Sequence, residues 1–104
     1  MEVCPVELSL KVLKNKWTIF IIRELLVSKK RFNELKKSLK GVTTKVLVET
    51  LKHLEQLNIL NRNSNNEFPL KVTYSLTELG KSLKLVLDAL SSWACENEEF
   101  IKFN

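Results

Sequence analysis

The chain has 104 residues, of which 17 are Lys or Arg and 12 are Asp or Glu, so its formal net charge is +5. This length fits one domain, and a hydrophobic content of 44% can supply one modest core. With two Gly and two Pro, the chain lacks the turn residues of a many-stranded β-sandwich or barrel. We therefore expect a single domain over residues 1–104, α+β in class and mainly helical.

Several classes of protein are disfavoured by the same composition. The longest uncharged apolar run, residues 17–22, is far shorter than the ~20 residues that a membrane-spanning helix needs. We see no signal-peptide pattern. Cys4 and Cys95 are too few for a secreted disulfide scaffold, and their spacing does not suggest a zinc site. We expect a cytoplasmic protein without a membrane partner, metal or cofactor.

Positive charge is concentrated in one segment. Residues 29–45 contain seven Lys or Arg side chains opposed by Glu34 alone, a local net charge of +6. Such an excess attracts polyanions, of which nucleic acid is favoured over an anionic membrane surface. The alternative interpretation is a solvated, lysine-rich face with no partner.

Four helices are predicted in the first half of the chain. A short helix over 6–13 follows Pro5, and a second over 17–28 is apolar on most sides, as expected of a buried helix. Phe32, Leu35 and Leu39 have the spacing of a third helix. Gly41 then breaks the pattern, and Thr43 can cap a fourth helix that runs to about residue 57.

The second half predicts a strand hairpin and a long helix. Strands over 59–63 and 71–76 flank a polar turn at 64–69. Thr77 can cap a helix that reaches about residue 97, and an apolar seam runs along it. Since this helix would extend beyond a small core, its apolar surface needs a partner, most simply a second copy of the chain. We assign Trp17, Phe20, Phe32 and Trp93 to the core.

This order of elements is that of a winged helix-turn-helix, with a two-stranded wing and a long C-terminal dimerisation helix. Residues 39–43 would form the turn, and the helix over 43–57 would be the recognition helix. A major groove about 12 Å wide admits one helix, whose side chains near its N-terminus contact the bases. The chain offers no nucleophile with a base, no paired carboxylates and no phosphate-binding glycine loop, so we do not expect an enzyme.

Several ordered motifs resemble those of the HxlR-type winged helix-turn-helix regulators, which are similar to the MarR-type regulators. The resemblance implies a prokaryotic, DNA-binding transcription factor that dimerises through its N- and C-terminal helices. It covers residues 4–93 and rests on Cys4-Pro5-Val6, Lys16-Trp17, Arg31-Phe32-Asn33-Glu34-Leu35, Leu51-Lys52-His53-Leu54-Glu55, Tyr74-Ser75-Leu76-Thr77-Glu78-Leu79-Gly80 and Leu90-Ser91-Ser92-Trp93. The family's Gly-Gly before Lys-Trp is Lys14-Asn15 here, and Asn58, Leu70 and Thr73 also depart from its pattern.

The predicted DNA-binding residues come from this resemblance and from the charge pattern. The resemblance places four side chains on the groove-facing side of the recognition helix and a basic one at the base of the wing. The charge pattern adds phosphate contacts, for which Arg31 is the best choice because a guanidinium binds phosphate bidentately. The full set is Arg31, Lys36, Lys37, Thr43, Thr44, Lys45, Val48, Lys52 and Lys71.

Glu49, Cys4 and Cys95 each have two possible roles. Glu49 could accept from a cytosine or pair with Lys45 or Lys52. Relatives sense oxidants or electrophiles through a cysteine where this chain has Cys4, but an inert interface thiol is at least as good an interpretation. Cys95 is structural or forms an intersubunit disulfide, and His53 is taken as a surface residue.

The function predicted is that of a homodimeric, sequence-specific regulator of transcription that binds double-stranded DNA. A small-molecule or oxidant effector is a further expectation. The alternative is a winged-helix adaptor that binds protein and not DNA.

Overall fold

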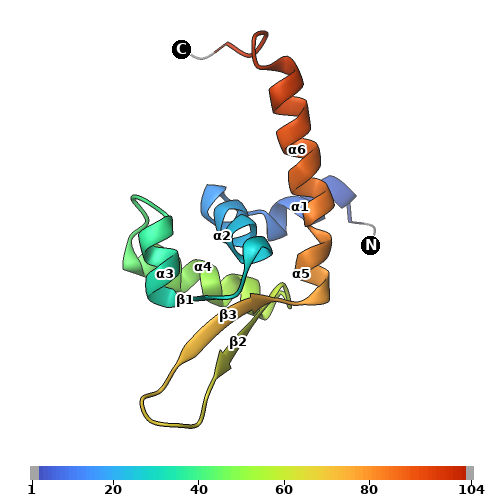
Figure 1. The fold of residues 1–104 in the computed structure, drawn as a ribbon. Helices are drawn as coiled ribbons and strands as arrows, with labels where there is room; N and C mark the ends of the chain where they lie inside the picture. Colours follow the sequence, from blue (N-terminus) through green and yellow to red (C-terminus); the bar gives the residue numbers. More distant parts are fainter. Residues whose placement is uncertain (1–2, 103–104) are drawn as a thin grey trace.

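The computed structural model describes residues 3–102 and has the predicted winged-helix architecture (Figure 1). Each predicted helix and strand of the first 76 residues is present, with ends that differ by one or two positions. In chain order the elements are α1 (Pro5–Val12), α2 (Lys16–Val27), β1 (Lys30–Arg31), α3 (Phe32–Ser38), α4 (Thr44–Gln56), β2 (Leu60–Ser64), β3 (Val72–Leu76), α5 (Glu78–Ser82) and α6 (Lys84–Asn97).

The core lies where α2 packs against α3, α4 and β3, and where α4 packs against β2. The predicted burial of α2 is confirmed, since Ile21 and Ile22 are inaccessible to solvent. Trp17, Phe20 and Phe32 are half-buried and pack against this core. The largest fully buried apolar side chains are Ile21, Ile22, Leu35, Leu47, Leu54 and Leu60.

Side-chain caps fix where the main helices begin. Thr43 is the N-cap of α4, as predicted, and its hydroxyl accepts from the Val46 N–H at 3.1 Å. Asn15 caps α2 by accepting from the N–H groups of Trp17 and Thr18 at 2.9 and 3.3 Å. Such caps contribute about 1 kcal/mol each. The departure from the family's Gly-Gly motif therefore gives α2 a side-chain cap.

The sheet has three strands, one more than we predicted. Its order is β1-β3-β2 and both pairings are antiparallel, with Arg31 opposite Thr73 and Asn63 opposite Thr73. Strand β1 is two residues long and carries no apolar alternation, so only its pairing with β3 defines it. This pairing holds the start of α3 against the base of the wing.

The predicted C-terminal helix is divided at Leu83. Thr77 caps its first part, α5, by accepting from the Gly80 N–H at 3.0 Å. The Leu83 N–H then donates to the carbonyl of Gly80 at 3.1 Å. This bond to the third residue back forms a 3₁₀-type turn between the two helices. α5 packs on β3, and the first part of α6 packs against α2 through Leu87, whereas the rest of α6 runs away from the body (Figure 1).

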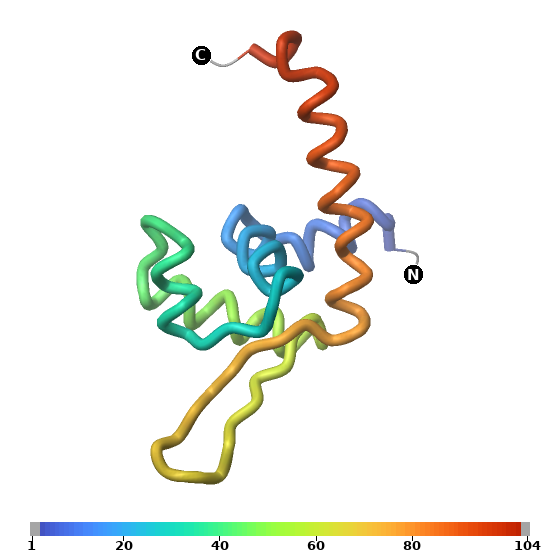
Figure 2. The backbone as a smooth tube through the Cα atoms, viewed as in Figure 1, coloured from blue at the N-terminus to red at the C-terminus, as the bar shows by residue number. Residues whose placement is uncertain are grey.

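Two helices carry no buried residue, α1 and α6. In Figure 2 the upper part of α6 and the wing point away from the body at opposite ends of the molecule. Trp93 is 61% exposed, so its assignment to the core of one chain is wrong. None of the helices in residues 3–102 has the length and hydropathy that a membrane span requires.

Candidate nucleic-acid interface

Helix α4 has one buried and one solvent-facing side. Leu47, Thr50, Leu51 and Leu54 face the core. The four predicted groove-facing residues lie on the other side or at its edge, since Thr43, Thr44 and Lys45 are exposed and Val48 is half-buried. Lys52, also a predicted DNA-binding residue, is exposed on this helix. The helix is therefore held by its apolar side while its polar side is free to contact a partner.

The turn before α4 depends on a glycine with a left-handed backbone. Gly41 has φ = +89°, a conformation that side chains other than that of glycine rarely adopt. Leu39 and Val42, on either side, are buried and anchor the turn to the core. The turn thus fixes α3 relative to α4, as in other helix-turn-helix units.

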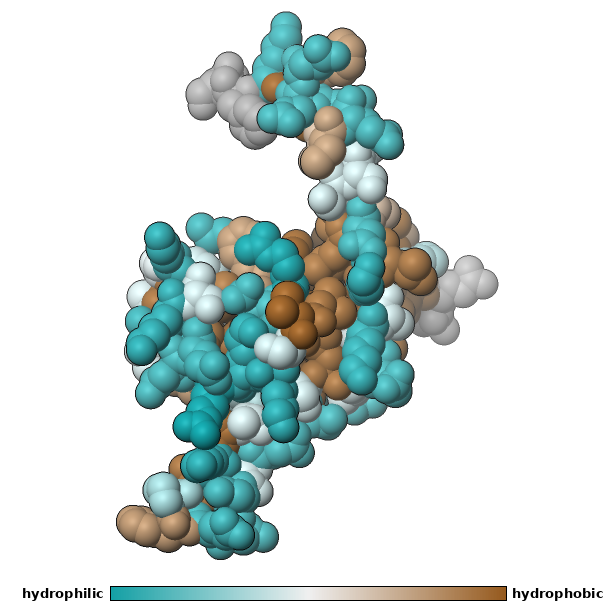
Figure 3. Space-filling model, in the orientation of Figure 1, coloured by the Kyte–Doolittle hydropathy of each residue, from teal (hydrophilic) through white to brown (hydrophobic). Residues whose placement is uncertain are grey.

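Helix α3 places its cations on the surface. Leu35 anchors the helix in the core, while Lys37 is exposed and Lys36 is half-buried. Glu34, the one acidic residue of the basic segment, accepts from the Arg31 N–H at 2.9 Å and so caps α3. Figure 3 shows a largely hydrophilic surface over α3.

Two predicted phosphate-binding residues, from distant parts of the sequence, line one hollow. Arg31 at the start of α3 and Lys71 at the base of the wing both border it, together with Phe32, Asn33, Glu34, Leu70 and Val72. The pairing of β1 with β3 brings them together. Both side chains are exposed.

The cations of this face lack acidic partners. Within residues 3–102 the ion pairs are Lys81–Glu78 at 3.3 Å and Lys84–Asp88 at 2.6 Å, both in the C-terminal helices. The charged side-chain nitrogens of residues 29–45, of Lys52 and of Lys71 have no carboxylate oxygen within 4.0 Å in the described part of the chain. Their positive charge is therefore available to an anionic partner.

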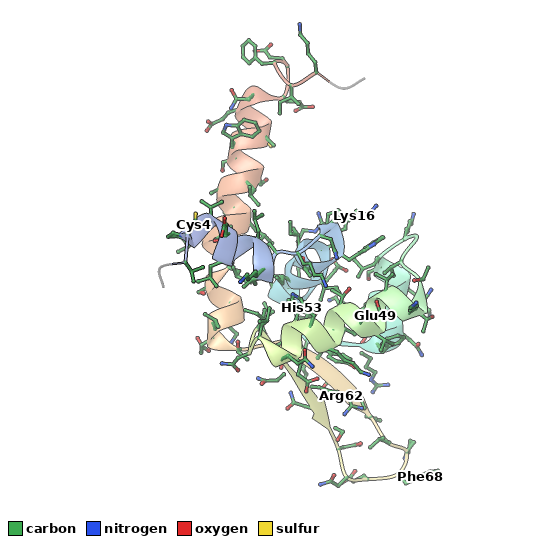
Figure 4. The ribbon with its side chains drawn as sticks, turned by 180° about the vertical axis from the view of Figure 1, so that it is seen from behind. Cys4, Lys16, Glu49, His53, Arg62 and Phe68 are labelled. Atoms are coloured by element: carbon green, nitrogen blue, oxygen red, sulfur yellow. The ribbon has the colours of Figure 1, made fainter. Side chains whose placement is uncertain are left out.

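One further cation of the wing was not predicted. Arg62 lies directly opposite Tyr74 in the sheet, and opposite residues of an antiparallel pair project to the same face. Tyr74 is buried, whereas the Arg62 side chain is exposed. Arg62 lies beside α4 (Figure 4). The register of β2 against β3 identifies Arg62. The sequence alone does not, because there Arg62 is a single basic residue in a polar stretch.

Glu49 and His53 border the side of α4 that faces the start of α2. Glu49 borders a small hollow at the start of α2, which is lined also by Lys14, Asn15, Thr18, Val46, Thr50 and His53. No ion pair joins it to Lys45 or Lys52 among the described residues. His53 is half-buried rather than fully on the surface, and its Nε2 lies 3.1 Å from the carbonyl oxygen of Lys11, which links α4 to α1 (Figure 4).

The two cysteines are free thiols and both are exposed. Cys4 is the N-cap of α1, and the backbone N–H groups of Glu7 and Val6 lower the pKa of its thiol. A lowered pKa raises the fraction of nucleophilic thiolate. Within residues 3–102 no three His, Cys, Asp or Glu side chains gather as metal ligands would.

Comparison with known proteins identifies the family. The model of the family described as HxlR-like helix-turn-helix matches residues 12–101. The chain belongs to this family. The HxlR-type protein is a transcriptional regulator of the helix-turn-helix type and not an enzyme, in agreement with the motifs noted in its sequence.

Relatives and solved structures agree with the family. The HTH-type transcriptional regulator YodB of Bacillus subtilis strain 168 is 38% identical over 92 residues, which are 88% of this chain and 82% of YodB. The structure of the regulator YtcD is similar with a TM-score of 0.89 and 37% identity, covering 93% of this chain and 99% of YtcD. The redox regulator HypR in its reduced form has a TM-score of 0.87 and 33% identity, covering 93% and 96%.

Proposed function

We propose that this HxlR-type regulator binds double-stranded DNA in a sequence-specific manner, with α4 in the major groove. The observation that carries the proposal is the unpaired basic surface on α3, α4 and the wing. Arg31, Lys36, Lys37 and Lys71 would bind phosphates and so fix the register of the protein on the duplex. Thr43, Thr44, Lys45, Val48 and Lys52 would follow the groove along α4, and Arg62 would add a cation beside them.

The DNA-binding unit is proposed to be a homodimer joined through α1 and α6. Short helices without buried residues gain little stability from their own hydrogen bonds, so α1 and α6 need a packing surface. Each exposes large apolar side chains, among them Leu8 and Leu10 on α1 and Leu90 on α6, all at least half exposed. Two recognition helices on one side of a duplex would read half-sites about one helical turn, ~34 Å, apart.

Removing both cations of the hollow tests the placement of the DNA backbone. The double variant Arg31→Ala/Lys71→Ala should bind operator DNA and unrelated duplex more weakly by a similar factor, because phosphate contacts carry no sequence information. The slope of log affinity against log salt should fall by about one for each phosphate that the variant no longer binds. Fluorescence anisotropy at several salt concentrations measures both quantities.

The matched control is Lys81→Ala, which removes a lysine of α5 that pairs with Glu78. This variant should keep the affinity and salt slope of the parent protein. If the double variant also kept both, the hollow would not contact the DNA backbone.

The Cys4 thiol is proposed to make DNA binding sensitive to oxidants. Its exposure and lowered pKa support this role, and two similar proteins have structures of oxidised or diamide-treated forms, HypR and YodB. Diamide joins two thiols in a disulfide and is itself reduced to the hydrazine. We expect it to change the operator affinity of the parent protein by about tenfold and that of Cys4→Ser not at all.

The partner thiol is identified by Cys95→Ser. If Cys4 of one protomer pairs with Cys95 of the other, this second variant also loses the response, and no disulfide-linked dimer forms on a non-reducing gel. An unchanged diamide response in Cys4→Ser would show that Cys4 is an inert thiol.

A further inference from the structure

The tip of the wing presents an aromatic side chain to solvent. Phe68 is 99% exposed, and Leu70 two residues later is 64% exposed. Figure 3 shows hydrophobic residues at the far end of the wing, beyond its polar strands. A phenyl ring held in water forgoes the stabilisation that burial would give it. The exposed apolar side chains of the tip would therefore be stabilised by contact with a partner.

The tip is held in place at its base. The Asn65 N–H donates to the carbonyl of Lys71 at 3.0 Å, and the Lys71 N–H donates to the side-chain oxygen of Asn65 at 2.6 Å. These two bonds close the loop across residues 66–70. Because the loop is closed in the free protein, less conformational entropy is lost when its tip docks.

The charge of the wing fits an anionic partner. Arg62 and Lys71 flank the loop, Glu67 is its single acidic residue, and Leu70 borders the same hollow as Arg31 and Lys71. The wing tip is also remote from the apolar surface of α6, which runs toward the other end of the molecule (Figure 2). A second copy docked on α1 and α6 would leave Phe68 uncovered.

We propose that Phe68 inserts into the minor groove of the operator, against a base step next to the major groove occupied by α4. This inference rests on the proposed DNA binding and names a contact within it. Phe and Leu are among the apolar side chains that enter the minor groove and partly unstack a base step. The cations at the base of the wing would hold the phosphates on either side, so the ring and the charges act on the same groove.

The test compares Phe68→Ala with the parent protein on an operator duplex located by footprinting. Base–aromatic stacking predicts a loss of operator affinity of about tenfold, with an unchanged salt slope because the ring contacts no phosphate. A 2-aminopurine placed at the base step under the wing should brighten when the parent protein unstacks it. It should stay dark with Phe68→Ala.

Two further variants sharpen the result. Phe68→Leu keeps an apolar side chain and should retain part of the affinity, whereas Phe100→Ala removes a ring of 70% exposure after the end of α6 and should change nothing. Circular dichroism should show all variants folded, since these side chains support no core.

The outcomes separate this proposal from the proposed function. If the parent protein binds the operator and Phe68→Ala binds equally well, or if 2-aminopurine responds equally to both, the insertion of Phe68 is wrong while DNA binding stands. If the parent protein binds no duplex, both proposals are wrong.

Discussion

Replacing Gly80 with alanine is expected to destabilise the protein by about 3 kcal/mol or more, which is at the high end for a single substitution. A Cβ atom at this position would overlap the carbonyl oxygen of Ile59 and lie 3.0 Å from Cδ2 of Leu76. Backbone at Ile59 cannot move aside cheaply, because the same carbonyl accepts from the N–H and the hydroxyl of Thr77, both at 3.0 Å. Urea unfolding followed by circular dichroism, at one fixed protein concentration, gives the free energy of unfolding.

Gly41→Ala is the matched control for this prediction. Gly41 has a positive φ, but no atom lies within 4 Å of an added Cβ. The cost there is conformational strain alone, about 1–2 kcal/mol. Equal destabilisation by the two substitutions would contradict the close packing of α5 on Ile59.

If the protein forms the dimer proposed above, Leu90→Glu is expected to make it monomeric and to lower operator affinity about 100-fold or more. Leu90 is half exposed on α6 and borders an apolar surface with Leu85, Val86, Ala89 and Trp93. A carboxylate buried there against a second copy would lack a partner. Losing the second half-site also removes the gain from bivalent binding. Sedimentation or light scattering gives the mass, and fluorescence anisotropy gives the affinity.

Leu70→Glu is the control for the mass measurement, because Leu70 is 64% exposed on the wing, at the other end of the molecule. It should remain dimeric. In a Trp17→Phe background Trp93 is the single tryptophan, and its emission should shift to the blue as the dimer forms. A monomeric parent protein would contradict the proposed interface.

Local rules predict most of the fold from the sequence. Thr43 and Thr77 are identifiable as caps because a hydroxyl before an apolar repeat can accept from the third residue of the helix. Asn58 stands where the family has Gly and takes φ = +62°, as its tolerance for left-handed backbone allows. These features depend on a few neighbouring residues, so a single sequence contains them.

Features that depend on tertiary contacts were not predicted. Strand β1 exists only through its pairing with β3, and α5 but not α6 packs on that strand, so the division at Leu83 has no counterpart in the apolar spacing. The contact between His53 and Lys11 spans 42 residues. The spacing of Trp93 fits an apolar seam and so favours a core position, but spacing does not say whether the seam faces its own chain or another.

The sequence predicted which residues form the candidate site more fully than it predicted how they lie relative to one another. Every predicted DNA-binding side chain is exposed or half-buried, yet the sequence could not place Arg31 and Lys71 beside one hollow. It also did not indicate Arg62, which depends on strand register. Direct contact of any of these residues with DNA stays a prediction.

The measurement that tests the central claim most directly is the affinity of the parent protein and of Lys45→Ala for two duplexes. One duplex is the upstream region of its own gene, and the other is a scrambled sequence of equal length and composition. We predict that the parent protein binds the upstream duplex at least ~10³-fold more tightly than the scrambled one. Lys45→Ala should lose much of this preference. A parent protein that binds neither duplex, or both equally, would contradict sequence-specific recognition through α4 and favour a protein-binding adaptor.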